Sequence, residues 1–306
     1  MEVDVLIPVY RPDGKLTELL KRLKMQNYPI HRVILMNTEE KHFPTELTGI
    51  WDRVEVYHLA KEEFDHGGTR DRGVRMSTAD LVLCMTQDAM PADETLIEEL
   101  VKPFDDPEVW AAYARQLPNE DCREVEKYTR SFNYPERSMV KTKEDLDRLG
   151  IKTFFCSNVC AAWRREKYLE LGGFVKHTIF NEDMILAGTM IKQGGKIAYC
   201  AKAKVIHSHN YSAFQQFHRN FDLAVSQTMY PEVFGGIRSE SEGIKLVKKS
   251  LSYCIKIGKP WLMIQVVTQS AGKLLGYKMG QRYRSLPMWL ILRCTMSPSF
   301  WRGGKA

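Results

Sequence analysis

Acids and histidines that follow short apolar runs are the first residues that could do chemistry in this 306-residue sequence. Asp88 lies shortly after the apolar run 81–85, and His207 and His209 end the run that begins at 203. Carboxylates and imidazoles are common ligands of the divalent cations that act on phosphates. Both features also have structural explanations, since Asp88 could cap a helix near 94–100 and the histidines could be a hydrogen-bonded surface pair.

A second candidate is the acid pair formed by Glu182 and Asp183, at the start of a helix that we predict over 181–193. A carboxylate there can take a proton from a hydroxyl group if it faces a cleft. Acids in the first turn of a helix also favour the helix dipole, so the pair has an equally simple structural explanation.

A glycine-containing loop over 64–73 runs into a predicted helix. Glycines let the backbone approach a ligand, and a helix N-terminus favours anions. Asp65 could therefore accept a hydrogen bond from a base or ribose, and Arg70 could meet a base or a phosphate. The alternative is a tight turn with charged side chains on the surface.

Buried strands must position these side chains. Four short apolar runs predict such strands, at 3–9, 32–36, 54–59 and 81–85. Helical spacing separates them at 16–24 and 70–76, and this alternation predicts a mostly parallel sheet with crossover helices. Ligands of such sheets lie beyond the carboxyl ends of the strands, which is where Asp88 stands. Further strands are predicted at 196–199 and 203–207, and helices from about 213.

The composition is that of a globular protein, with 44% apolar and 27% charged residues. It excludes wholesale disorder and a polytopic membrane protein. No uncharged apolar stretch of about 18 residues predicts a spanning helix, and Glu2 and Asp4 argue against a secretory signal. Seven cysteines, an odd number, suggest reduced thiols in a cytoplasmic protein. Cys156 and Cys160 lack the second pair that a zinc site would need.

Charge divides the chain near residue 237. Residues 1–237 have a net charge of −5, whereas residues 238–306 contain 13 Lys and Arg against two acids, a net of +11. The basic, aromatic and amphipathic tail fits an anionic membrane surface. Packing on the catalytic domain or in a homo-oligomer interface is the alternative. Because the tail has no nucleic-acid recognition motif and residues 1–237 are acidic, we expect no nucleic-acid partner.

The order of these features resembles the family-2 glycosyltransferases of the GT-A fold over residues 1–225. The opening run 3–10 is similar to the first strand of that family, and Thr69-Arg70-Asp71-Arg72-Gly73 is similar to its Ala-Arg-Asn-x-Gly segment. Thr86-Gln87-Asp88 occupies the Asp-x-Asp position, and residues 181–183 match the Glu-Asp motif. Two departures are Thr86 in place of the first acid, and Asn37-Thr38-Glu39-Glu40 in place of Asp-Asp-Gly-Ser.

The resemblance implies an α/β fold, the GT-A nucleotide-diphospho-sugar transferase fold, over 1–237. A nucleotide-binding half would cover 1–100 and an acceptor half 101–237, followed by a helical extension over 238–306. It implies that Asp88, with His207 or His209, holds Mg²⁺ or Mn²⁺. Asp183, with Glu182 beside it, would be the catalytic base of an inverting transfer. The implied donor-binding residues are Pro8, Tyr10, Thr38, Asp65, Arg70, Gln87 and Arg115.

Several longer segments look like a bacterial rhamnosyltransferase subgroup, at 63–70, 86–91, 115–118, 132–135 and 155–158. This implies dTDP-L-rhamnose as donor and a polyprenyl-linked polysaccharide precursor as acceptor. Together with the basic tail over 243–306, such an acceptor predicts a peripheral place on the inner face of the cell membrane. Alternatives are a family-2 transferase for another nucleotide sugar, a nucleotidyltransferase, and a non-catalytic scaffold that binds a sugar nucleotide. The single glycine in 8–14 disfavours the nucleotidyltransferase, whereas Thr86 leaves the scaffold open.

Overall fold

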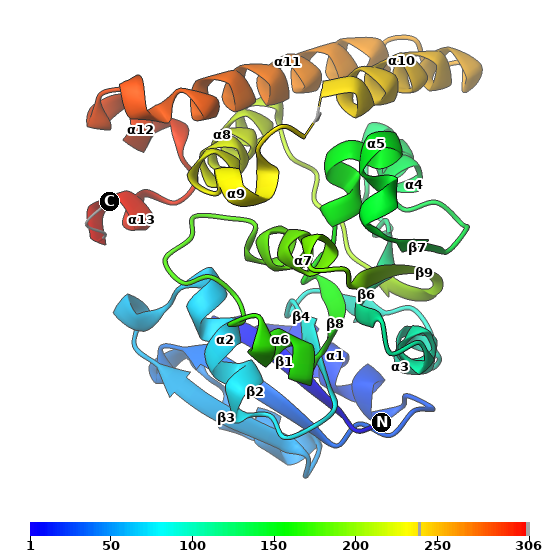
Figure 1. Ribbon diagram of the computed structural model, residues 1–306, viewed down its shortest axis with the longest axis vertical. Helices are drawn as coiled ribbons and strands as arrows, with labels where there is room; N and C mark the ends of the chain where they lie inside the picture. The colour runs from blue at the N-terminus through cyan, green and yellow to red at the C-terminus, as the bar shows by residue number, and fades with distance from the viewer. Residues whose placement is uncertain (238–239, 304–306) are drawn as a thin grey trace. The chain divides into compact units, whose positions relative to one another are not determined.

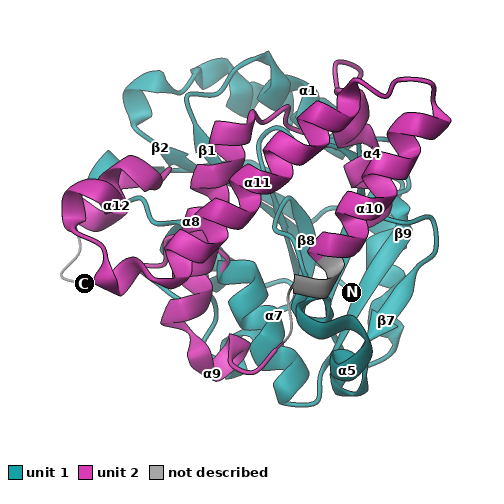
Figure 2. Cartoon of the chain, turned by 90° about the horizontal axis from the view of Figure 1, so that it is seen from above, with its two compact units in different colours: residues 1–119, 134–176, 182–207 teal, residues 120–133, 177–181, 208–306 magenta. Residues whose placement is uncertain are grey.

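The computed structural model describes residues 1–237 and 240–303. The chain divides into two compact units, coloured separately in Figure 2. Unit 1 consists of residues 1–119, 134–176 and 182–207, and unit 2 consists of 120–133, 177–181 and the chain from Ser208 on. The helices over 213–234 thus belong with the C-terminal helices, so these units divide the chain earlier than the domain boundary that we predict near 237.

Four parallel strands form the N-terminal half of the sheet of unit 1, in the order β3-β2-β1-β4. They are β1 (Val3–Tyr10), β2 (Arg32–Thr38), β3 (Val54–Leu59) and β4 (Leu81–Met85). Helix α1 (Gly14–Lys24) begins at an Asp13 cap and buries four leucines, and α2 (His66–Met76) leads into β4. Figure 1 shows these elements together, coloured from blue to cyan. The predicted strands and helices of this half are confirmed.

The other half of the sheet is mixed, in the order β4-β8-β6-β9-β5, with β7 also paired to β9. Its strands are β5 (Met90–Pro91), β6 (Val109–Leu117), β7 (Met139–Lys141), β8 (Cys160–Arg164) and β9 (Lys196–Ile206). Strand β8 runs antiparallel to both β4 and β6, so the expectation of a mostly parallel sheet holds only for the N-terminal half. The two strands predicted over 196–207 are the single strand β9, which has a register shift opposite Ala114 and Arg115.

Short elements complete unit 1. Its remaining α-helices are α3 (Leu96–Val101), α5 (Leu146–Leu149), α6 (Arg165–Glu170) and α7 (Glu182–Lys192). Its 3-10 helices are η1 (Glu40–His42), η2 (Thr45–Ile50), η3 (Lys61–Glu63), η4 (Lys102–Asp105), η5 (Lys143–Asp145) and η6 (Gly150–Phe154). The core lies on the sheet, where Phe104, Trp163 and Tyr168 are among the largest fully buried side chains.

Unit 2 is helical in the part of the chain that the structure describes. Its helices are α4 (Glu124–Asn133), α8 (Ala213–Met229), α9 (Pro231–Phe234), α10 (Glu240–Lys256), α11 (Leu262–Gln281), η7 (Tyr283–Ser285), α12 (Met288–Cys294) and α13 (Pro298–Gly303). One apolar cluster centres on Phe221 and Ile291, and another joins α4, α10 and α11 through Val125, Cys254 and Val266. None of the helices within residues 1–237 and 240–303 is long and apolar enough to cross a bilayer. All seven cysteines are unpaired and buried, as expected.

Candidate active site

Asp88 and His207 form an Asp–His pair at the edge of unit 1 where β4 and β9 end. The Asp88 Oδ2 atom lies 3.6 Å from Nε2 of His207, whose ring is buried. Asp88 stands in the turn between β4 and β5 and does not cap a helix, because α3 begins only at Leu96. Asp93 accepts the hydrogen bond from the backbone N–H of Thr95 instead. The helix-cap explanation of Asp88 is therefore wrong.

Gln116 fixes the orientation of the His207 ring. Its Oε1 atom lies 3.3 Å from Nδ1 of His207, while its Nε2 atom donates to the Ser157 hydroxyl at 3.2 Å. Since an amide oxygen can only accept, this contact places a proton on Nδ1 and leaves Nε2, on the side of Asp88, as the ring nitrogen that could bind an ion. A carboxylate oxygen beside an unprotonated imidazole nitrogen is a donor set that fits Mn²⁺ or Mg²⁺.

His209 is the other histidine predicted to bind a metal. It follows His207 by two residues, so the chain holds its Cα within about 7 Å of the Cα of His207. The division between the units falls between His207 and Ser208, which places His209 in unit 2. The geometry within unit 1 therefore supports His207 as a ligand.

The acid pair lies at the start of α7, and its two carboxylates have different surroundings. The Glu182 Oε1 atom lies 3.2 Å from Nη1 of Arg70, and both side chains are buried. The side-chain amide of Asn158 also donates to Oε1 of Glu182, at 3.2 Å. Burial alone would raise the pKa of Glu182, but the charges of Arg70 and His66, with hydrogen bonds from Asn158 and the backbone, together outweigh it and lower that pKa. Glu182 is therefore an ionised, ion-paired group.

Within residues 1–237 and 240–303, the hydrogen bonds to the Asp183 carboxylate come from backbone N–H groups. Oδ2 accepts from the backbone N–H of Asn158 at 3.0 Å, and Oδ1 accepts from that of Met184 at 2.8 Å. Burial, together with the negative charge of Glu182, raises the pKa of Asp183 to about 7. A carboxylate with a pKa near neutral can accept a proton and release it again at physiological pH.

Residues Ser157, Asn158 and Val159 connect the acid pair to the Asp–His pair. Ser157 holds Gln116, Asn158 bonds to both members of the acid pair, and the Val159 carbonyl accepts the backbone N–H of Thr86 at 3.3 Å. The Asn158 Oδ1 atom accepts in turn from the buried indole N–H of Trp163. One short segment before β8 therefore orders both candidate reactive groups.

Residues of the loop 64–73 make contacts within unit 1. Asp65 is the N-cap of α2, and its Oδ2 atom accepts from the backbone N–H of Gly68 at 2.6 Å. A Cβ atom added at Gly67 would lie 1.9 Å from the carbonyl oxygen of Val175, so only glycine allows this close approach. Arg70 also donates to the backbone carbonyl of His66. The structure thus places Arg70 beside the acid pair, and Asp65 in a helix cap.

Four of the predicted donor-binding residues gather where β1, β2 and β4 end. Gln87 bridges to the backbone of Tyr10 through two hydrogen bonds, of 3.0 and 3.1 Å. Thr38 is paired with Tyr10 in the β1–β2 register, and Pro8 lies two residues before Tyr10 in β1. In the described chain, buried Asn37 Oδ1 and Thr38 Oγ1 have no hydrogen-bond partner. Buried polar atoms without partners at a strand end indicate a ligand position.

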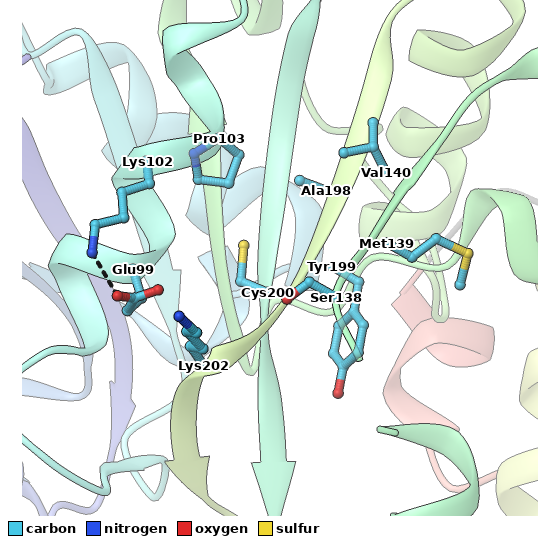
Figure 3. A pocket seen from close by; sticks show the side chains of 10 residues that line it. All are labelled: Glu99, Lys102, Pro103, Ser138, Met139, Val140, Ala198, Tyr199, Cys200 and Lys202. Carbon is cyan, nitrogen blue, oxygen red and sulfur yellow. Dashed lines mark hydrogen bonds and ion pairs between the residues drawn. The ribbon is translucent and has the colours of Figure 1, made fainter. Parts of the chain in front are cut away.

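Arg115, next to Gln116 in β6, forms an ion pair with Glu136, whose Oε1 atom lies 3.0 Å from the Nη2 atom of Arg115. A pocket of about 160 Å³ lined by residues of β7, β9, α3 and η4 is drawn in Figure 3, and it contains none of the predicted site residues. The ion pair of Glu99 and Lys102 stands at its rim.

Sequence reasoning missed the roles of Gln116 and Asn158. Both act as positioning residues through contacts that are distant along the chain, 91 residues from Gln116 to His207 and 25 from Asn158 to Asp183. No spacing rule connects such positions. The only signal was that 115–118 and 155–158 both belong to the segments that look like the rhamnosyltransferase subgroup.

Comparisons with known proteins show the family of the chain. The model of the glycosyl transferase family 2 matches residues 4–172. The O-antigen chain rhamnosyltransferase RfbN of Salmonella typhimurium is 37% identical over 305 residues, which cover 98% of this chain and 96% of that protein. The O-antigen chain rhamnosyltransferase WbaN of Salmonella anatum is 40% identical over 247 residues, or 79% of this chain and 78% of that protein.

Solved structures share the fold at low sequence identity. The mannosyltransferase PcManGT from Pyrobaculum calidifontis, in complex with GDP-Man and Mn²⁺, superposes with a TM-score of 0.58 at 14% identity and covers 97% of this chain and 87% of its own. TarS of S. aureus, residues 1–349, superposes with a TM-score of 0.56 at 13% identity and covers 93% and 92%. The predicted family and GT-A fold are confirmed.

Proposed function

The chain belongs to glycosyl transferase family 2 and is a glycosyltransferase, and we propose that it transfers L-rhamnose from dTDP-L-rhamnose to a polyprenyl-linked O-antigen precursor. The relatives carry this proposal, since two O-antigen chain rhamnosyltransferases are 37% and 40% identical over most of the chain. The subgroup segments around the Ser157–Val159 connection and the loop 64–73 support the same donor class.

The transfer we propose is a single displacement with inversion at the anomeric carbon. Asp183 takes the proton of an acceptor hydroxyl while that oxygen bonds to the anomeric carbon, and the bond to the diphosphate breaks with its electron pair on the leaving oxygen. Asp183 then releases the proton to solvent. The observation that favours Asp183 over Glu182 is the Arg70 ion pair, which keeps Glu182 ionised and bound inside the protein.

A divalent cation, Mg²⁺ or Mn²⁺, fits the Asp–His pair, with His209 as a further ligand that the short chain connection can supply. When bound, such an ion would neutralise charge on the departing diphosphate. Gln116 holds the His207 ring in the tautomer that can ligate.

On the donor side, the buried Asn37 and Thr38 oxygens are the groups that would accept hydrogen bonds from the nucleoside. Gln87 is hydrogen-bonded to the backbone of Tyr10 at the same strand ends, and Pro8 precedes Tyr10 in β1. Arg70 acts as a positioning residue for the acid pair, and Asp65 caps the N-terminus of α2, the helix that carries Arg70. Contact between the donor and Arg115 remains a prediction.

We assign the acceptor to a membrane lipid and the basic extension over 243–306 to the anionic surface of the inner face of the cell membrane. Residues 243–306 contain 12 Lys and Arg and no acid. This charge supports a lipid surface more than a homo-oligomer of like-charged copies.

A donor screen tests the proposal directly. Full-length protein is incubated with dTDP-L-rhamnose, dTDP-glucose, UDP-GlcNAc and GDP-mannose, each with Mg²⁺ or Mn²⁺, and nucleoside diphosphate release is measured. We expect release from dTDP-L-rhamnose only. Preference for another donor contradicts the rhamnose assignment, pyrophosphate release indicates a nucleotidyltransferase, and no release from any donor indicates a non-catalytic scaffold.

A further inference from the structure

Helix α11 carries a band of exposed apolar side chains along one face, which we call the α11 stripe. Its members are Ile264, Val267, Leu274 and Leu275, of which Ile264 is 71% and Leu275 60% exposed. The spacing of three, seven and one residues keeps them on one side of the helix. Exposed Trp261 extends the stripe at its N-terminal end.

Glycines line the C-terminal half of the opposite face of α11. Gly272, Gly276 and Gly280 lie against the backbone carbonyls of Ala213, Phe217 and Phe221 in α8, and a Cβ atom at Gly276 would come within 2.1 Å of the Phe217 oxygen. Figure 2 shows the two helices of unit 2 crossing. A helix of a soluble protein normally packs its bulky apolar side chains inward. Here Leu262, Met263 and Val266 pack inward in the first turns and the glycines pack inward farther along, while the α11 stripe stays exposed and needs a partner.

The charges around the stripe identify that partner. No charged side chain lies within the stripe itself, and Lys278 and Arg282 are exposed at its C-terminal end. Exposed Lys256 precedes its other end, and Trp289 of α12 is a further exposed indole. Apolar side chains between basic and aromatic ends are typical of a helix that lies in a membrane interface. A second copy would bring this acid-free surface against itself, which like charges oppose.

We propose that the α11 stripe docks on an anionic lipid bilayer, with its apolar side chains at the boundary of the acyl chains and Lys278 and Arg282 among the headgroup phosphates. The stripe is about 20 Å long, from 261 to 275, and lies in the plane of the membrane. This inference rests on the proposed function, because a polyprenyl-linked acceptor is reached only at the membrane.

Vesicle co-sedimentation of the full-length protein tests the inference. The vesicles are phosphatidylcholine alone, or phosphatidylcholine with about one-third phosphatidylglycerol, at low and high salt. The variant I264D/L275D places two acids in the stripe, and M25D is the matched control, since Met25 is also 60% exposed but lies at the end of α1. We expect wild type and M25D to pellet with anionic vesicles at low salt, and I264D/L275D to lose at least tenfold in partitioning.

A second variant, K278Q/R282Q, leaves the stripe intact and removes only the charges at its end. We expect it to keep its melting temperature and to lose most of its preference for anionic vesicles. The inference is overturned if wild type does not pellet at low salt, if I264D/L275D binds as wild type does, or if size exclusion shows a dimer that I264D/L275D dissociates. Donor turnover without vesicles is measured in parallel, and its absence in wild type contradicts the proposed function and not the docking.

Discussion

Two neighbouring carboxylates at the start of α7 differ because of what surrounds them. Glu182 is paired with the positive charge of Arg70, whereas Asp183 accepts its hydrogen bonds in the described structure from backbone N–H groups. The two groups are therefore expected to respond differently to removal of their charge.

We expect Asp183→Asn to lower kcat at least about 100-fold with little change in donor affinity, because it removes the proton acceptor and keeps the shape. Glu182→Gln should instead lower stability by about 3 kcal/mol, since it leaves buried Arg70 unpaired. Single-turnover rates, donor titrations and thermal melts separate the effects. A nearly wild-type Asp183→Asn enzyme beside an inactive but folded Glu182→Gln enzyme would reverse the assignment.

The rate should also depend on pH through Asp183. Its folded-state pKa is raised to about 7, and the base must be deprotonated to act, so kcat/KM is expected to fall as the pH drops below about 7. Glu182→Gln should move this midpoint to lower pH, because it removes the negative charge that helps raise the pKa. A midpoint that stays in place, or moves upward, in Glu182→Gln contradicts this account.

At the Asp–His pair, Asp88→Ala is expected to abolish turnover while the protein still melts cooperatively. Gln116→Ala should keep the chemistry but weaken activation by Mn²⁺ about 10-fold or more, because the His207 ring loses its orienting partner. Activity titrated against Mn²⁺ after EDTA treatment measures both. Full activity in excess EDTA would contradict the metal assignment.

At the scale of elements, the crossing of α8 and α11 depends on the absence of side chains. The glycines of α11 let the two backbones approach, and their outward neighbours form the α11 stripe. A Gly→Ala substitution should therefore lower the stability of the protein in α11 and raise it in the neighbouring helix α10.

Gly276→Ala is expected to lower the melting temperature of the protein by several degrees, because the new methyl group meets the backbone of α8 and cannot be accommodated by a side-chain rotation. Gly243→Ala is the matched control in α10, where an added Cβ atom would meet no described residue outside its own helical turn within 4 Å, and helix propensity should stabilise the variant by up to about 1 kcal/mol. Equal melting temperatures for the two variants would show that the close approach contributes nothing.

For the whole molecule, the parts that could be predicted from sequence are those with continuous local signals. β4 matches its apolar run to the residue, because a parallel strand that is buried on both faces needs uninterrupted apolar sequence, and the partly exposed edge strand β3 also has its predicted bounds. The strand order of the region 105–180 could not be predicted from sequence. Strand β8 inserts antiparallel between β4 and β6, and such pairings depend on contacts between residues far apart along the chain. The candidate site followed the same rule, since its motifs were visible and its positioning residues were not.

The pairing of β9 has a consequence for synthesis. In the described structure β5 and β7 pair only with β9, and β6 gains its second neighbour from it. Since β9 ends at Ile206, a nascent chain carries these strands with open edges until about two thirds of it has left the ribosome. Open edges invite pairing with other chains. Ribosome-stalled chains that stop before 196 should therefore need chaperones, and chains released just beyond 206 should need them far less.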